Sequence, residues 1–203
     1  TYWNMANAVL LAINNGINPL TGKQGPVKTG YLYDMKSFEE VKQAYIKIVH
    51  YYADWQVTMT NFYELVAAEY MPIPMVSATM DGCMEKGADV TWGGAKYNST
   101  GCSGIGCANV ADSLSAIKYL VYDTKRYTPR EFYDAVMSNW EGLEPMRQVV
   151  RNEVPRYGNG DPYVDELAQW AMDVFADRIR EGTGPRGRFR PGIYPVSAHI
   201  AFG

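Results

Sequence analysis

The sequence predicts an α/β fold that is mostly helical and ends in a single strand. Three observations support this prediction: an apolar repeat sustained over residues 38–66, later segments that open with helix-capping residues, and a short β-branched segment over residues 193–202. A chain of 203 residues is long enough to form one sizeable core or two small ones.

The N-terminal region is expected to form a helix followed by a surface loop. Apolar residues at Met5, Val9 and Ile13 recur at helical spacing, so residues 2–15 are predicted to be helical, with Asn15-Gly16 ending the helix. Residues 16–36 are rich in glycine and proline, which is typical of a loop on the surface.

The longest predicted helix begins after Ser37, which forms a capping-box pattern with Glu40. Its apolar positions alternate spacings of three and four, as in a heptad repeat: Phe38, Val41, Tyr45, Ile48, Tyr52, Trp55, Met59, Phe62 and Val66. Such a seam is compatible with a coiled coil formed with a partner, and equally with a long helix packed against other helices of the same protein.

Four further helices are expected. Pro72 and Pro74 end the long helix, and a short helix carrying Cys83 is predicted over residues 75–86. Thr128-Pro129-Arg130-Glu131 is a second capping box that begins a helix reaching about Trp140. Residues 143–153 form the next helix, and Asp161-Pro162 begins a long one.

The stretch from Gly93 to Lys118 combines a glycine-rich segment with a predicted helix. Five glycines fall between residues 93 and 106, which predicts a tight turn, and Val110, Leu114, Ile117 and Val121 then follow at helical spacing. A glycine-rich turn before a helix can hold an anion, or it can serve only to pack the chain closely. A nucleotide-binding function for residues 101–107 is therefore one alternative. It lacks the preceding strand and the later acidic residue of a dinucleotide-binding unit, and no glycine loop here ends in the GK[ST] of a phosphate-binding loop.

The C-terminal region is predicted to contain an arginine-bearing loop and then a strand. Residues 182–192 hold Arg186, Arg188 and Arg190 among glycines and prolines, so they are expected to form a solvated loop or to bind an anion. Residues 193–202 are predicted to form a buried strand, which needs partner strands outside this chain.

Composition and residue counts exclude several functions. A net charge of −3 shows no excess of basic residues that would bind nucleic acid or an anionic membrane. No apolar segment is long enough to span a bilayer. Three cysteines without a regular framework indicate a reducing, cytoplasmic setting and structural thiols. Two histidines, His50 and His199, argue against a histidine-rich metal site, and no GxSxG motif supports a hydrolase. Asp112, Asp161, Asp165 and Glu166 could be paired carboxylates, although Asp161 also suits a helix N-cap, and Asp165 and Glu166 the first turn of that helix.

Several motifs in order resemble one family. GGAKYN at 93–98, ADSLSAIK at 111–118 and YGNGDPYVDELA at 157–168, with AINNG at 12–16, resemble the pyruvate formate-lyase-like glycyl radical enzymes, and the resemblance extends over essentially all 203 residues. It implies that residues 1–203 are one partial domain without an internal boundary. The family fold is a ten-stranded barrel of two half-sheets wrapped by long outer helices.

The resemblance also implies a chemistry. In this family a glycyl radical takes a hydrogen atom from a cysteine, and the thiyl radical then attacks a small-molecule substrate. DGCMEKGADVTWGGAKYNSTG at 81–101 is similar to the dehydratase and lyase branch, with pyruvate formate-lyase activity as the alternative. The catalytic cysteine loop and the radical glycine match no residue here, so the chain is expected to be an inactive fragment of its parent. A radical-SAM activating enzyme with an iron–sulfur cluster and a second copy of the parent chain are the expected partners.

Four positions carry over as candidates for the substrate pocket, and none as catalytic, cofactor-binding or metal-binding residues. Tyr2 matches a pocket aromatic of the family, and Tyr194 matches a pocket residue on a barrel strand. Val196 and Ala198 share the face of Tyr194 by the period of two in a strand. The alternative outside enzymology is a helical interaction module that uses the seam over residues 38–66.

Overall fold

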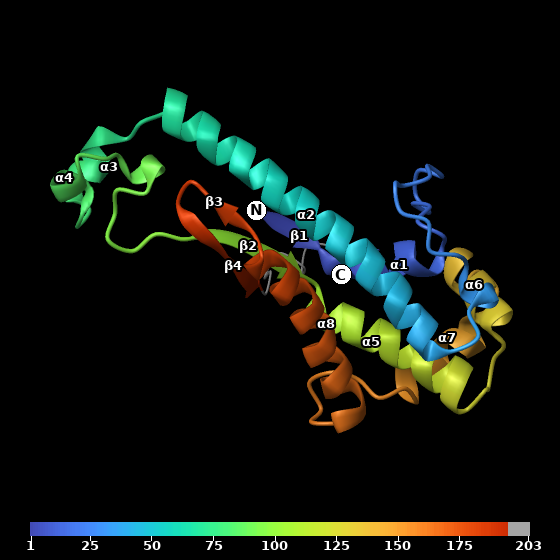
Figure 1. Cartoon of the computed structure of the whole chain (residues 1–203). Helices are drawn as coiled ribbons and strands as arrows, with labels where there is room; N and C mark the ends of the chain where they lie inside the picture. The colour runs from blue at the N-terminus through green and yellow to red at the C-terminus, as the bar shows by residue number, and fades with distance from the viewer. Residues whose placement is uncertain (195–203) are drawn as a thin grey trace. The chain divides into compact units, whose positions relative to one another are not determined.

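The computed structural model describes residues 1–194, which divide into two compact units (Figure 1). The first, called here the sheet unit, contains residues 1–3, 52–104 and 175–194. The second, the helical unit, contains residues 4–51 and 105–174. The prediction of one partial domain over residues 1–203 stays a prediction.

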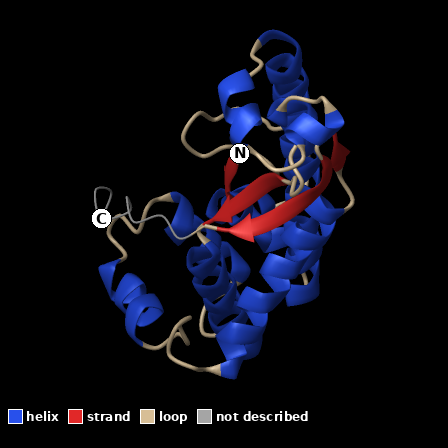
Figure 2. Cartoon of the chain, turned by 90° about the vertical axis from the view of Figure 1, so that its left-hand side faces the viewer, coloured by secondary structure: helices blue, strands red, loops and turns tan. Residues whose placement is uncertain are grey.

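The sheet unit is built on four short strands, β1 (Tyr2–Asn4), β2 (Thr100–Ile105), β3 (Thr183–Gly184) and β4 (Gly187–Ile193). Their order in the sheet is β1-β2-β4-β3, and the strands are drawn as red arrows in Figure 2. β2 and β4 are parallel, in a register that runs from Thr100 opposite Phe189 to Gly104 opposite Ile193. β3 and β4 form a small antiparallel hairpin.

Two parts of the sheet differ from the sequence-based expectations. Residues 100–105 form a strand and not a glycine-rich turn, and residues 187–193 form a strand where a solvated loop was expected. The reason is tertiary: each segment pairs with the other, which no local pattern in either one reveals. Of the strand predicted over residues 193–202, Ile193 ends β4 and the Tyr194 amide donates a 3.0 Å hydrogen bond to the Gly104 carbonyl of β2. Residues 195–202 lie outside the described residues, so the partners of that strand stay a prediction.

One face of this sheet is buried. Thr100, Cys102 and Phe189 are 1%, 0% and 2% exposed, and they alternate along their strands with exposed or half-buried residues. On the buried side, Thr60 and Glu64 of α2 (Phe38–Tyr70) approach β2, and Asn61 donates a 3.0 Å hydrogen bond to the carbonyl of Thr183. The sheet unit therefore has one face packed on helix α2 and one face open.

The rest of the sheet unit follows the C-terminal end of α2. It contains α3 (Pro74–Thr79), α4 (Cys83–Lys86) and a 3-10 turn, Val90–Trp92. The single helix predicted over 75–86 is interrupted at Gly82, because its φ of +95° does not continue a helix. Only glycine fits there, since an added Cβ would lie 2.8 Å from the Lys96 amide nitrogen.

The helical unit contains most of the predicted helices. They are α1 (Met5–Ile13), the first part of α2, α5 (Cys107–Ile117), α6 (Pro129–Met137), α7 (Glu144–Asn152) and the first part of α8 (Pro162–Arg180), with a 3-10 turn, Leu32–Asp34, and a π-helical turn, Lys118–Asp123. Cys107 and Ala111 of α5 share a core cluster with Val164 and Ala168 of α8. These small side chains let the two helices pack closely.

The predicted caps are present with one variation. Thr128 and Glu131 make both reciprocal bonds of a capping box, and Asp161 accepts a bond from the Tyr163 amide. At α2, the Glu40 amide donates to Ser37 Oγ, but the Glu40 carboxylate accepts from the amide of Lys36 instead of that of Ser37.

The predicted seam of α2 holds only in its first half. Val41, Tyr45 and Ile48 are buried as expected, whereas Trp55 and Phe62 are 48% and 58% exposed. In that second half the buried residues include Gln56, Thr60 and Ala68. A straight helix of 3.6 residues per turn drifts from a strict heptad by about 20° per repeat, so the buried face rotates away from the seam.

We expect Gly184→Ala to destabilise the protein by about 1–3 kcal/mol, because overpacking forces neighbouring atoms to move. A Cβ at Gly184 would overlap Asn61 Oδ1 and would lie 3.0 Å from a ring carbon of Phe189. Urea unfolding measures the free energy. Asn61→Ala combined with Gly184→Ala should cost less than the sum of the two single changes.

Gly101→Ala is the matched control for this prediction. Gly101 lies in the same sheet with nothing within 4 Å of an added Cβ, so alanine there should be neutral or slightly stabilising. Equal losses at positions 184 and 101 would contradict the close approach of Asn61.

Candidate functional site

The open face of the sheet is the first candidate site. It carries Tyr2, Gly101, Ser103, Arg190, Gly192 and Tyr194, and we call this set the open sheet face. In the register of β2 and β4, Gly101 lies opposite Arg190 and Ser103 opposite Gly192. A Cβ added at Gly192 would lie 3.5 Å from Ser103 Oγ, so these two positions point to the same side.

Two of the residues predicted for the pocket come together on this face. The rings of Tyr2 and Tyr194 have centroids 5.3 Å apart, tilted by 56°, although the two residues come from opposite ends of the described chain. They are 65% and 50% exposed, and neither hydroxyl has a hydrogen-bond partner among residues 1–194. Val196 and Ala198, the other two predicted residues, lie outside the described residues, as does His199.

Bonds on either side of Tyr2 fix its direction. The Ser103 amide donates to the Thr1 carbonyl at 2.9 Å, and Gln56 Nε2 donates to the same carbonyl at 3.1 Å. Trp3 packs its ring against those of Tyr52 and Phe175, at 5.8 and 6.0 Å. Because successive side chains of a strand point to opposite faces, packing the half-buried Trp3 against these rings directs Tyr2 to the open face.

A buried ion pair holds the hairpin that carries β4. Glu64 Oε1 accepts bonds from Arg186 Nε at 3.0 Å, from Arg186 Nη2 at 2.5 Å and from Thr100 Oγ1 at 2.6 Å. The Glu64 side chain is only 10% exposed, and its Oε2 is buried without a hydrogen-bond partner. Arg186 is one of the three arginines considered for binding an anion. It is therefore already paired with a carboxylate of this chain, that of Glu64.

The cysteines do not reach the open sheet face. Cys102 lies on the buried face, with Sγ 3.5 Å from Thr1 Oγ1 and 4.0 Å from Thr60 Oγ1. Cys83 and Cys107 are also buried and free, and burial raises the pKa of the Cys107 thiol. Within residues 1–194, no group of three histidine, cysteine or acidic residues is arranged to hold a metal ion.

The other residues singled out from the sequence have structural partners. Asp112 accepts a 2.8 Å bond from the Tyr157 amide, so it holds a loop and is not part of a carboxylate pair. Asp54, one turn from His50, binds Arg178 with both oxygens, at 2.7 and 2.8 Å. Residues 101–105 form a strand, which leaves no loop there to wrap a phosphate.

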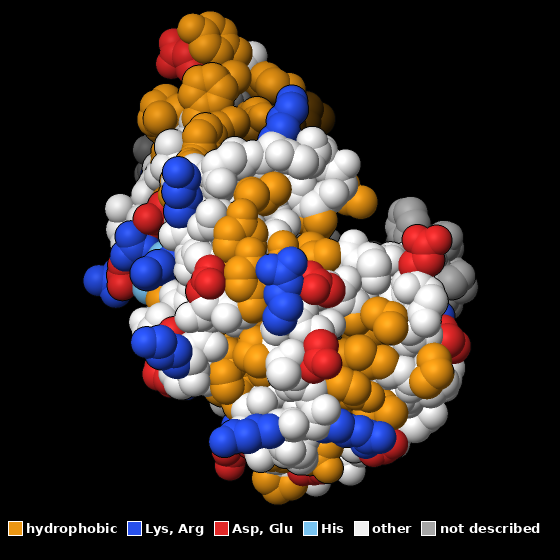
Figure 3. Space-filling model, turned by 90° about the vertical axis from the view of Figure 1, so that its right-hand side faces the viewer, with side chains coloured by type: hydrophobic (Ala, Val, Ile, Leu, Met, Phe, Trp, Pro, Cys, Tyr) orange, Lys and Arg blue, Asp and Glu red, His pale blue; other side chains and the backbone are white. Residues whose placement is uncertain are grey.

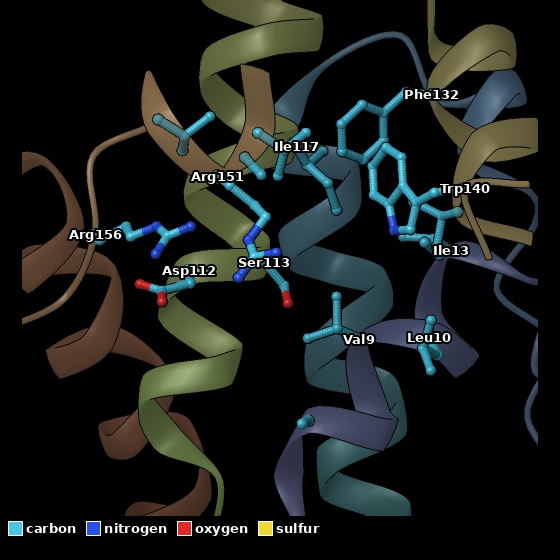
Figure 4. Close-up of a pocket in the computed structure, with 15 residues that line it drawn as sticks. Val9, Leu10, Ile13, Asp112, Ser113, Ile117, Phe132, Trp140, Arg151 and Arg156 are labelled. Carbon is cyan, nitrogen blue, oxygen red and sulfur yellow. The ribbon is translucent and has the colours of Figure 1, made fainter. Parts of the chain in front are cut away.

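A pocket of about 430 Å³ lies among α1, α5, α6 and α7 of the helical unit (Figure 4). Val9, Ile13, Ile117, Phe132 and Trp140 form its apolar wall, while Asp112, Arg151 and Arg156 lie at its other side. Sequence analysis missed this pocket, because its lining comes from four helices whose apolar positions each look like ordinary core.

An exposed apolar region marks the C-terminal end of α2 and the segment after it. We call it the apolar tip: Phe62, Tyr63, Leu65, Tyr70, Met71, Ile73, Met75, Val76, Met80 and Met84. Figure 3 shows hydrophobic side chains gathered at the top of the drawn face, the height at which Figure 1 draws this end of α2. In the described part of the chain, no helix is both long and apolar enough to cross a membrane.

Comparison with known proteins identifies the family. Residues 1–203 match the pyruvate formate lyase-like family. The chain is 36% identical over its whole length to trans-4-hydroxy-L-proline dehydratase from Clostridioides difficile, and its structure matches that enzyme with a TM-score of 0.94. It is 37% identical to (2S)-3-sulfopropanediol dehydratase from Klebsiella oxytoca. The glycerol-bound glycerol dehydratase from Clostridium butyricum matches with a TM-score of 0.92 and 35% identity.

The chain belongs to the pyruvate formate lyase-like family, and its relatives are glycyl radical dehydratases and lyases. All of this chain aligns with each of the three relatives, but it spans only 25–26% of their length. The mostly helical α/β fold predicted from the sequence is confirmed, whereas the ten-stranded barrel stays a prediction.

We expect Arg186→Met to lower the free energy of unfolding by about 1–3 kcal/mol, because it leaves the largely buried Glu64 carboxylate without its cation while the partly exposed site still admits water. Chemical denaturation of the two proteins measures the difference. Adding Glu64→Gln should recover part of the loss, since the amide carries no charge that needs a partner.

Arg188→Met serves as the control, because Arg188 is exposed on the same hairpin and has no acidic partner within 4 Å among the described residues. A loss at position 188 as large as that at position 186 would show that the ion pair does not stabilise the hairpin.

Proposed function

We propose that this chain is part of a glycyl radical enzyme that removes water or another small group from a small polar substrate, and that the open sheet face is part of the wall of its substrate cavity. The observation that supports this best is the pairing of Tyr2 with Tyr194 on an exposed sheet face, in a chain 36–37% identical to two dehydratases.

The exposure of this face is a second observation that supports its assignment to a cavity wall. Parallel strands are almost always covered on both faces in known proteins. Here the parallel strands β2 and β4 are covered on one face only by the described residues. The open sheet face is therefore suited to lie inside a larger structure, facing a substrate and further polypeptide.

The proposed chemistry assigns clear tasks to this chain's own residues. A glycyl radical with a cysteine thiol supplies hydrogen-atom abstraction in such an enzyme. No cysteine of residues 1–194 lies on the open sheet face, so we place the reactive cysteine outside these residues. The radical glycine is placed outside them too, because no glycine here matches the radical loop of the family, and we expect the chain alone to be inactive. Tyr2 and Tyr194 bring free hydroxyls that can bind a substrate hydroxyl, and rings that exclude water from it.

The proposal includes partners and a setting. A radical-SAM activating enzyme with an iron–sulfur cluster would install the radical, and the parent chain would form a homodimer in the cytoplasm. Substrates named for the relatives are hydroxyproline, sulfopropanediol and glycerol, which are all small and hydroxylated. The finer alternative, formate acetyltransferase activity, would show as formation of acetyl-CoA and formate from pyruvate and coenzyme A.

A non-catalytic interaction module is the second candidate, favoured by the apolar tip. The hypothesis made for the seam over residues 38–66 predicts that the chain alone forms a dimer held by α2, which size-exclusion chromatography and crosslinking would detect. Since Val41, Tyr45 and Ile48 of that seam are buried within the chain, the exposed end of α2 is the part left to form such a contact.

The test of the proposed function uses the protein of the complete reading frame, prepared anaerobically with its activating enzyme. We expect the doublet electron paramagnetic resonance signal of a glycyl radical, and elimination products from small hydroxylated substrates by mass spectrometry. Tyr194→Phe should lower kcat/KM by about tenfold or more, because it removes one hydrogen bond to the substrate.

Tyr97→Phe is the control, since Tyr97 is 87% exposed and lies before β2, outside the set of residues that form the open sheet face. A protein that forms no radical, or whose activity is equally sensitive at positions 97 and 194, would contradict the proposal.

A further inference from the structure

We infer that Arg190 is an anion-binding residue of the open sheet face, which makes the enzyme select substrates with a carboxylate or sulfonate over neutral polyols. This inference rests on the proposed function, because it assumes that the open sheet face meets the substrate.

The position of Arg190 on the face is well defined. It follows Phe189, which is 2% exposed on the buried side, and it precedes Tyr194 by four residues on the same side of β4. Its partner in the register is Gly101 of β2, and the next residue on its own strand face is Gly192. With no side chain at either of these neighbours, the space beside the guanidinium on the sheet is open.

The charge of Arg190 is not neutralised within the described chain. Arg186 binds Glu64, Arg178 binds Asp54, and Arg180 binds Asp177. Among residues 1–194, no carboxylate lies within 4 Å of the Arg190 guanidinium. A central strand of a sheet thus presents a free cation on a face that also carries two aromatic rings with free hydroxyls.

The spacing suits a small bifunctional molecule. A strand rises about 3.3 Å per residue, so the Cα atoms of Arg190 and Tyr194 are about 13 Å apart. A separation of this size leaves room between the two side chains for a molecule of a few carbon atoms. The guanidinium can bind a carboxylate or a sulfonate through two parallel hydrogen bonds, while Tyr2 and Tyr194 can bind a hydroxyl at the other end.

The relatives show that both substrate classes occur among proteins of this kind. Hydroxyproline carries a carboxylate and sulfopropanediol a sulfonate, whereas glycerol is neutral. Arg190 favours the anionic class for this chain.

The test uses the complete enzyme before activation, so that binding is measured without turnover. Isothermal titration with trans-4-hydroxy-L-proline, (2S)-3-sulfopropanediol and glycerol compares the three chemistries. We expect one of the two anions to bind at least about tenfold more tightly than glycerol, and Arg190→Gln to weaken its binding by about 10- to 100-fold. Which anion binds distinguishes a carboxylate site from a sulfonate site.

Two further variants make the result specific. Arg190→Lys should recover part of the affinity, because it keeps the charge and loses the bidentate geometry. Arg188→Gln should weaken it less, since Arg188 lies on the same side of β4 as Arg190 but two residues further from Tyr194. In the activated enzyme, Arg190→Gln should raise KM for the anion more than it lowers kcat.

Equal binding of glycerol and the anions, no binding of any of the three, or full affinity in Arg190→Gln would overturn the inference. The glycyl radical signal does not depend on Arg190, so its presence would leave the proposed function standing in each of these cases. Absence of the radical would contradict the proposed function instead.

Discussion

The parallel pairing of β2 with β4 is the constraint on which the rest of the sheet unit depends. Parallel strands need a long connection, and here more than eighty residues of chain separate the two paired segments. Because their side chains alternate between two faces, a single register decides at once which residues are buried and which remain open. Thr100, Cys102 and Phe189 become core, and Gly101, Ser103 and Arg190 become surface.

The buried face is unusually polar for a core, and this bears on how β4 is held. Gln56, Thr60 and Glu64 follow one another along α2 at intervals of four, and they meet Thr1, Cys102 and Thr100 through hydrogen bonds. A buried ion pair adds little net stability compared with apolar packing, but it is costly to leave half made. The contact of Glu64 with Arg186 therefore penalises any other register of the hairpin, which would leave the carboxylate without its cation.

The sequence predicted the helices well and the sheet poorly, for physical reasons that particular residues make clear. Thr128 and Glu131 satisfy each other's backbone groups within four positions, so that helix start is visible locally. β2 contains Gly101 and Gly104, which weaken any local strand signal, and its partner lies far along the chain. The pairing of Tyr2 with Tyr194 had no signal in periodicity either, and only the resemblance to a known family placed both residues in one pocket.

The arginines near the C-terminal end illustrate how the structure separates support from function. From the sequence, Arg186, Arg188 and Arg190 were equivalent members of one loop, each able to bind an anion or to be solvated. The structure gives Arg186 a buried carboxylate, which fixes it as support for the hairpin. Arg190 lies on the other face, opposite a glycine and without a carboxylate among the described residues. A cation whose backbone position is fixed by the sheet but whose charge is not neutralised by the described residues is free to bind an external anion, and here it shares its face with the tyrosine pair.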